Sequence, residues 1–153
     1  ESSRFEATWE LGIAVMLTGP ARIVRAALPY LRKSDFPRVV NIASTEALGA
    51  TPGGVAYAAA KTGLIGVTRS LAVEYGREGI TINCICPGAV RTGLTEQIPE
   101  ESKEKFVRRR VPVQRYGFPE EVAHMTLSLC LPAASYVNGA VLPVDGGLTI
   151  KNA

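Results

Sequence analysis

The sequence predicts an α/β protein, in which helices cover both faces of an open, parallel β-sheet. Two observations lead to this fold class. Helix-like and strand-like segments alternate along the 153 residues, in the order helix, strand, helix, strand, helix, strand. Apolar residues recur at steps of three and four in the helix-like segments, as on one face of a helix. There is no internal repeat and no flexible linker, so we expect residues 1–153 to form a single domain.

The first expected helix ends near Ser34. Its apolar face is formed by Ile13, Leu17, Ala21, Val24, Leu28 and Leu31. The Gly19-Pro20 pair interrupts this pattern and predicts a kink. Residues 38–43 (RVVNIA) then predict a strand that is buried on both faces, and the Gly and Pro content of 45–54 predicts a loop.

The rest of the chain continues the alternation. A long helix is expected over 55–75, and its apolar stripe consists of Leu64, Val67, Leu71 and Tyr75. The most polar and irregular stretch is 89–117. The remaining expected elements are strands over 80–86 and 140–144, helices over 100–110 and 119–131, and a turn at Asp145-Gly146-Gly147.

Composition narrows the class of protein. The chain is 46% hydrophobic and 20% charged, with a net charge of +3, which suits a globular protein and is weak evidence for a polyanionic partner. No run approaches the ~18–20 apolar residues of a membrane span, and the first ten residues do not have the pattern of a signal peptide. We therefore expect neither a membrane nor a nucleic-acid partner.

The three cysteines argue against disulfide and metal sites. Cys84 and Cys86 are two residues apart on an expected strand, so their side chains point to the same face and do not suit a disulfide. No second cysteine pair or nearby histidine completes a metal site. Buried free thiols, no bound metal and a cytoplasmic location are the expectation.

Ser44, Tyr57 and Lys61 carry the chemistry that the sequence predicts. Ser44 follows the first expected strand, at the carboxyl edge of the sheet where ligands of such folds bind. Tyr57 and Lys61 are four residues apart and share one face of the next helix. A tyrosine has a pKa of about 10 and is a poor base at neutral pH, but a nearby ammonium stabilises its ionised form. An ordinary half-buried helix face is the alternative for Tyr57 and Lys61 taken alone.

Longer motifs follow in a characteristic order. The segments NIAS (41–44), YAAAK (57–61), LAVEYGREGITINCICPGAVRT (71–92), RYGFPEEVA (115–123) and SYVNGAVLPVDGG (135–147) resemble the second half of a short-chain dehydrogenase/reductase. The resemblance implies a Rossmann-like, doubly wound sheet and an NAD(P)-dependent oxidoreductase. Such an enzyme transfers a hydride between the nicotinamide of NAD or NADP and a small secondary alcohol or ketone.

The resemblance also implies a role for each site residue. Tyr57 would be the general acid/base, Lys61 would assist its ionisation and bind the nicotinamide ribose, and Ser44 would position the substrate oxygen. The cofactor side would be completed by Tyr57, Lys61, Pro87, Gly88, Val90 and Thr92. Family members are often dimers or tetramers, so we expect a homo-oligomer.

Two departures from the family pattern stand out. Met16 occupies the position where the family usually has an asparagine that holds a water of its proton relay. The glycine-rich turn that approaches the cofactor pyrophosphate does not occur in the sequence. We therefore expect the chain to be the catalytic part of a longer protein. The alternative is a non-catalytic oligomerising fragment that cannot bind a dinucleotide alone.

The basic run Arg108-Arg109-Arg110 leaves a further question open. A short basic run is usually a solvated helix end, and contact with an acidic group of the substrate is a less favoured alternative. A nucleic-acid site is the weakest alternative, because no aromatic residues interleave with the run.

Overall fold

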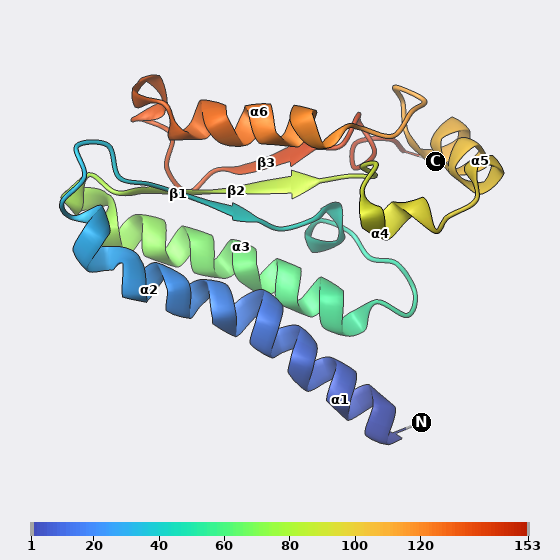
Figure 1. Ribbon diagram of the computed structural model, residues 1–153, viewed down its shortest axis with the longest axis horizontal. Coiled ribbons are helices and arrows are strands. Elements are labelled where there is room, and N and C mark those ends of the chain that lie inside the picture. The colour runs from blue at the N-terminus through green and yellow to red at the C-terminus, as the bar shows by residue number, and fades with distance from the viewer. Residues whose placement is uncertain (1, 153) are drawn as a thin grey trace.

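The structure, a computed structural model, describes residues 2–152. Its centre is a three-stranded parallel sheet in the order β1 (Arg38–Ile42), β2 (Thr81–Pro87) and β3 (Val141–Val144). Helices α2 (Gly19–Leu31) and α3 (Val55–Tyr75) lie on one face, and α6 (Pro119–Cys130) lies on the other (Figure 1). The expected α/β class, the parallel strands and the helices on both faces are therefore confirmed.

The predicted burial of the first strand is wrong. Of the five residues of β1, only Asn41 is buried, and Ile42 is 42% exposed. The reason is the place of β1 in the sheet, because it pairs with β2 on one side and with no strand of residues 2–152 on the other. By contrast, β2 lies between two strands and six of its seven residues are buried.

The first helix is interrupted by a π-helical turn. α1 (Ser2–Ile13) passes through the π-helical residues Ala14–Thr18 into α2, and the Gly19 N–H donates to the Ala14 carbonyl. A proline at position 20 lacks an N–H, and its ring would clash with the carbonyl of Met16 in a regular α-helix. The wider turn relieves this clash. The regular α-helix is thus interrupted by π-helical residues that directly precede Gly19-Pro20, and the kink expected at this pair stays a prediction.

The same long helix corrects the expectation about apolar runs. The stretch Arg4–Leu31 is long and apolar enough to cross a membrane, by length and composition only. Only 17% of its most apolar window is buried. One side of α1 contacts α3, where Gly12 allows the two helices to approach closely: a Cβ at Gly12 would lie 3.3 Å from that of Ala56.

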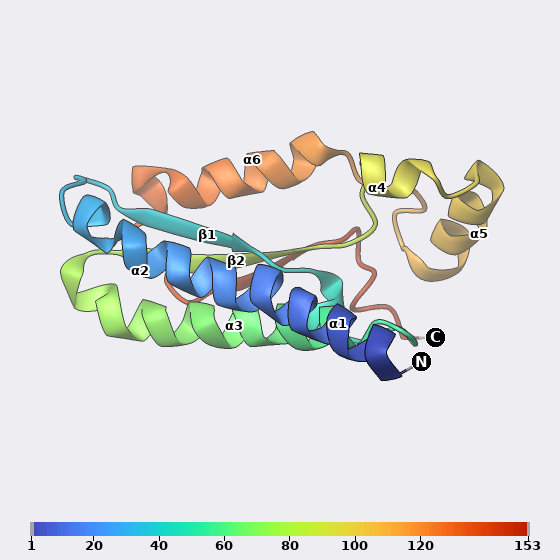
Figure 2. The same ribbon diagram turned by 60° about the horizontal axis from the view of Figure 1, so that its bottom comes forward.

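The core lies between the sheet and α3. The buried side chains on α3 are Ala56, Ala60, Leu64, Ile65, Thr68 and Ala72. Leu64 was expected in this stripe, whereas Val67, Leu71 and Tyr75 are only partly buried. The difference arises because α3 is covered by the sheet on one side and by α1 and α2 on another, so its buried surface is wider than a single stripe (Figure 2).

The remaining predicted elements agree with the structure to within one residue. They include the helix α5 (Glu100–Arg110) and the strands β2 and β3. A short helix, α4 (Gly93–Glu96), was not expected. The turn at Asp145 is confirmed, because its carboxylate accepts hydrogen bonds from the backbone of Gly147 and Thr149.

Candidate active site

Ser44 lies just beyond β1 at the carboxyl edge of the sheet. The preceding residue, Ala43, donates its N–H to the Ile85 carbonyl at 2.8 Å, which holds this part of the chain against β2. The Ser44 side chain is buried, and its Oγ accepts the N–H of Glu46 at 3.1 Å. The hydroxyl is thereby held in one position, and its own proton can be donated to a substrate oxygen.

Tyr57 and Lys61 lie in the first turns of α3, which begins at the same edge of the sheet (Figure 1). The Lys61 Nζ lies 5.6 Å from the centre of the Tyr57 ring, as expected for residues four apart on a helix. The same Nζ donates to the Ile42 carbonyl at 2.9 Å, two residues before Ser44. Lys61 therefore connects the helix that carries Tyr57 to the strand that leads to Ser44. The structure brings the three predicted residues to one edge of the sheet.

Lys61 is a partly buried cation. Burial lowers the pKa of its ammonium below the usual 10.5, and the nearby Cys84 and Cys86 thiols oppose this shift. An ammonium in such a place stabilises a neighbouring anion more strongly than it would in water. The position of Lys61 is thus suited to a proton-transfer partner.

Cys84 and Cys86 of β2 lie near the Lys61 ammonium. Cys84 and Cys86 are fully buried free thiols, as predicted, whereas Cys130 is exposed. The hydrogen bond from Cys84 and burial together raise the pKa of the Cys86 thiol. The same contact lowers the pKa of the Cys84 thiol to about 7. Both side chains are fully buried, so the pair is part of the packing.

The residues predicted on the cofactor side continue from β2 past the sheet edge. Pro87 is the last residue of β2, and the Gly88 N–H donates to the Val144 carbonyl at 3.0 Å. Val90 forms an isolated bridge with Gly117, and the Thr92 N–H donates to Thr95 Oγ1 at 2.9 Å at the start of α4. These four residues belong to one segment, 87–92, which follows β2 at the same edge of the sheet as Ser44.

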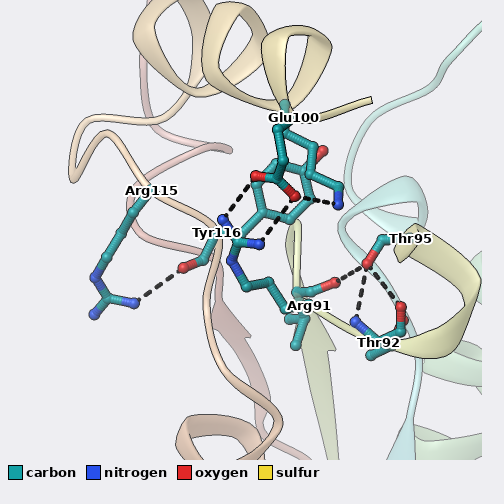
Figure 3. A network of polar contacts seen from close by, with 8 residues as sticks. Arg91, Thr92, Thr95, Glu100, Arg115 and Tyr116 are labelled. Carbon is teal, nitrogen blue, oxygen red and sulfur yellow. Dashed lines mark hydrogen bonds and ion pairs between the residues drawn. The ribbon is translucent and has the colours of Figure 1, made fainter. Parts of the chain in front are cut away.

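An ion-pair network holds α5 to this segment. The Arg91 guanidinium donates to both carboxylate oxygens of Glu100, at 3.2 and 3.1 Å, and Lys103 Nζ donates to the same carboxylate at 2.7 Å (Figure 3). These two cations lower the pKa of Glu100 to about 2. Sequence analysis missed the network, because nine residues separate Arg91 from Glu100 and no helical spacing relates them.

Met16 lies in the π-helical turn and is close to Tyr57. Both residues line a hollow of about 530 Å³ between α1 and the start of α3, together with Leu11, Val15 and Ala56. The methionine side chain reaches toward Gly12, where its Cε would lie 3.4 Å from a Cβ. The side of Tyr57 that faces α1 is therefore mainly apolar, with Arg4 and Thr8 as its polar members.

Known proteins with similar sequences and structures agree with this geometry. The chain matches the family model described as enoyl-(acyl carrier protein) reductase over residues 4–149. It is 38% identical over 145 residues to the 3-oxoacyl-(acyl-carrier-protein) reductase FabG of Thermotoga maritima, a match that covers 95% of this chain and 58% of that protein.

Two solved structures give the same result. The crystal structure of levodione reductase superposes with a TM-score of 0.87 at 36% identity, covering 95% of this chain and 59% of that one. A 4-hydroxyisoleucine dehydrogenase complexed with NADH and succinate superposes with a TM-score of 0.82 at 31% identity, covering 91% and 57%. The chain thus spans less than two thirds of the length of each protein. The family match covers nearly the whole chain and the fold is the Rossmann fold of these enzymes, so the chain belongs to the short-chain dehydrogenase/reductase family.

Proposed function

We propose that this chain forms the catalytic part of an NAD(P)-dependent oxidoreductase that interconverts secondary alcohols and ketones. The observation that carries the proposal is the placement of Lys61. Its ammonium lies beside the Tyr57 ring and bonds to the strand carbonyl two residues before Ser44. Names of the relatives support the substrate class, since they include a 3-oxoacyl reductase and a levodione reductase.

Each residue has a distinct task in the proposed reaction. Tyr57, 39% exposed, gives a proton to the carbonyl oxygen during reduction and takes one from the hydroxyl during oxidation. Lys61 stabilises the phenolate that remains. Ser44 donates a hydrogen bond to the same substrate oxygen, where negative charge develops in the transition state.

The residues at the sheet edge also suit the nicotinamide end of a dinucleotide. When bound, NAD or NADP supplies or accepts the hydride. Lys61 uses one donor on Ile42 and has others for ribose hydroxyls. We assign the remaining contacts on this side to the segment Pro87, Gly88, Val90 and Thr92. The pyrophosphate requires a glycine-rich turn, which residues 1–153 do not contain.

We also propose that the protein is a homo-oligomer, a dimer or a tetramer, in a reducing, cytoplasmic location. The outer side of α1 and α2 is apolar and open: Leu11, Val15 and Ile23 are each more than 60% exposed. A second copy of the chain would cover this surface, as the family resemblance implies. Fully buried thiols at Cys84 and Cys86 support a reducing compartment.

Leu11→Asp tests the homo-oligomer. The variant should elute as a smaller species on size-exclusion chromatography with light scattering, because a carboxylate in an apolar interface is costly. Glu10→Asp is the control on the exposed part of the same turn. If the mass of Leu11→Asp in solution equals that of the wild type, the proposed interface is contradicted. If the wild-type protein binds to lipid vesicles, the apolar face is assigned to a membrane instead.

A second candidate function is a non-catalytic oligomerising fragment. The lack of a glycine-rich turn in residues 1–153 favours it. The intact mass of the protein from its natural source is the first measurement. A mass near 16.3 kDa means that the dinucleotide half has to come from another chain, and a larger mass means that this is the catalytic half of a complete enzyme.

Tyr57→Phe then separates the two functions. Loss of the general acid should lower turnover of a ketone with NADH or NADPH by about 10²–10⁴-fold. Tyr136→Phe is the matched control, because Tyr136 is fully exposed and lies outside the site. Equal rates for Tyr57→Phe and wild type, or no activity in either, would favour the non-catalytic fragment.

A further inference from the structure

A groove of about 510 Å³ lies between α5 and the loop that follows the Ser44 turn. One wall contains Thr51 and Pro52, and the other contains Lys105, Phe106, Arg109 and Arg110. Figures 1 and 2 show α5 at the end of the molecule toward which the strands point. Ser44 follows the carboxyl end of β1 and so lies toward the same end. The groove therefore opens on the side of the sheet where the proposed reaction takes place.

The groove wall on α5 is basic and has no acidic member. Lys105 and Arg109 are four residues apart and share one helix face. Within residues 2–152, Lys103 and Arg108 pair with Glu100 and Glu104, but no carboxylate lies within 4.0 Å of the three groove cations. Glu101 and Glu104 line a second hollow, which shares Lys105 and Arg109 with the groove.

A fourth cation lies close by. The Lys151 Nζ donates to the Arg109 carbonyl at 2.8 Å, although Arg109 is at the carboxyl end of α5, where cations already gather. Basic residues in a last helical turn stabilise the helix through its dipole. The helix dipole explains why several basic residues occur in the last turn of α5. It does not require these residues to line a groove opposite the loop.

The loop wall connects the groove to the site. Thr51 and Pro52 belong to the segment that joins Ser44 to Tyr57, and the Thr51 hydroxyl donates to the Glu46 carboxylate at 2.7 Å. This bond folds the loop back toward the Ser44 turn. A substrate whose carbonyl lies at Ser44 and Tyr57 would follow this loop to bring its remote end to the groove.

We propose that the groove binds an anionic end of the substrate, a phosphate or a carboxylate, carried on an uncharged stem. Lys105, Arg109 and Arg110 supply donors for the anion, and guanidinium groups suit the planar or forked oxygens of both. Phe106 and Pro52 provide apolar contacts for the stem. The inference rests on the proposed function, because it takes the reacting carbonyl to lie at Tyr57.

The test is an equilibrium binding measurement on the whole protein as isolated. Three series of methyl ketones of graded chain length are titrated by calorimetry, ending in phosphate, in carboxylate or in an uncharged hydroxyl group. The anionic series should bind about tenfold tighter than the hydroxyl series at the best chain length, as expected for hydrogen bonds to a charged group. The tighter of the two anionic series identifies the group that the groove takes.

Two variants locate the effect. The double variant Lys105→Gln/Arg109→Gln should no longer bind the anionic series about tenfold more tightly than the hydroxyl series. Its affinity for the hydroxyl series should equal that of the wild type. Arg108→Gln is the matched control, since it removes a cation of the same helix that is paired with Glu104 and lies outside the groove. Equal affinity for charged and uncharged series, or an equal loss in Arg108→Gln, would overturn the proposal.

The same ketones separate this inference from the proposed function. Tight binding of the anionic series without oxidation of NADH or NADPH would uphold the groove and refute the oxidoreductase. Turnover of all three series with the same KM would uphold the oxidoreductase and refute the groove.

Discussion

Replacing Gly88 with alanine probes how closely the carboxyl ends of β2 and β3 are packed. A Cβ at this position would lie 2.8 Å from both the Cα and the Cβ of Asp145, and 3.3 Å from its carbonyl oxygen. These are atoms of the backbone and its first carbon, so no flexible side-chain end can move aside. β3 has to shift, and the hydrogen bond from Gly88 N–H to the Val144 carbonyl is strained by the same movement.

The expected loss of stability follows from these two effects. Overpacking of this kind costs about 1–3 kcal/mol, and one weakened backbone hydrogen bond adds about 0.5–1.5 kcal/mol. Gly88→Ala should therefore lower the free energy of unfolding by about 1.5–4.5 kcal/mol in urea titrations followed by circular dichroism. The loop from Val90 to Thr92 would move with it, so turnover should fall as well.

Gly66→Ala is the matched control. A Cβ at Gly66 meets no atom within 4 Å, and the residue lies in the middle of α3. Alanine there should raise the free energy of unfolding by about 0.5–1 kcal/mol, because glycine is a poor helix residue. If Gly88→Ala were as stable as wild type while Gly66→Ala behaved as expected, the tight contact between Gly88 and Asp145 would have no energetic consequence and the reasoning would be refuted.

Three further predictions concern charge and the proton path. Burial lowers the pKa of Lys61 below 10.5, so the wild type should gain stability relative to Lys61→Met as the pH rises from that lowered value toward 10.5, seen in thermal midpoints. Arg91 and Lys103 lower the pKa of Glu100 from 4.5 to about 2, so the wild type should lose stability relative to Glu100→Gln as the pH falls through this range. A difference in stability between variant and wild type that does not change with pH would contradict either prediction. Met16→Asn should change the pH–rate profile, because asparagine can hold the relay water that the family resemblance implies; an unchanged rate and profile would refute this.

Local patterns were enough to predict most of the elements. The helix α3 begins at Val55 and ends at Tyr75, and α5 spans Glu100–Arg110, as the sequence pattern predicts. Both helices are bounded by glycine or proline: Gly54 and Gly76 flank α3, and Pro99 precedes α5. These residues act on their own neighbours in the chain, so the limits of such helices can be predicted without knowledge of the fold.

Properties that depend on distant neighbours were not predictable in this way. The apolar sequence of β1 is typical of a strand buried on both faces, yet Ile42 is 42% exposed because no strand of residues 2–152 pairs with the outer edge. The position of the π-helical turn is a smaller case. Pro20 signals the break, but the turn takes up the residues before it, since proline disturbs the carbonyl four residues earlier.

The same distinction applies to the candidate site. Spacing on one helix was enough to place Tyr57 beside Lys61, and the strand end was enough to place Ser44. The hydrogen bond from Lys61 to the Ile42 carbonyl spans 19 residues and depends on how α3 packs against the sheet. The network of Arg91 and Glu100 depends likewise on the path of the chain after β2, which no local pattern describes.

The hydrogen bonds that position Ser44 and Lys61 lie within this chain. Ser44 is held through the pairing of Ala43 with β2 and by Glu46, and Lys61 is held by the Ile42 carbonyl. The dinucleotide pyrophosphate, by contrast, needs a glycine-rich turn that residues 1–153 do not contain. The outer edge of β1 pairs with no strand of the described residues 2–152, so further parallel strands can pair there. Proton transfer and pyrophosphate binding therefore depend on different parts of the proposed enzyme. Changes at Ser44, Tyr57 or Lys61 should thus impair turnover more than they impair affinity for the pyrophosphate end of the cofactor.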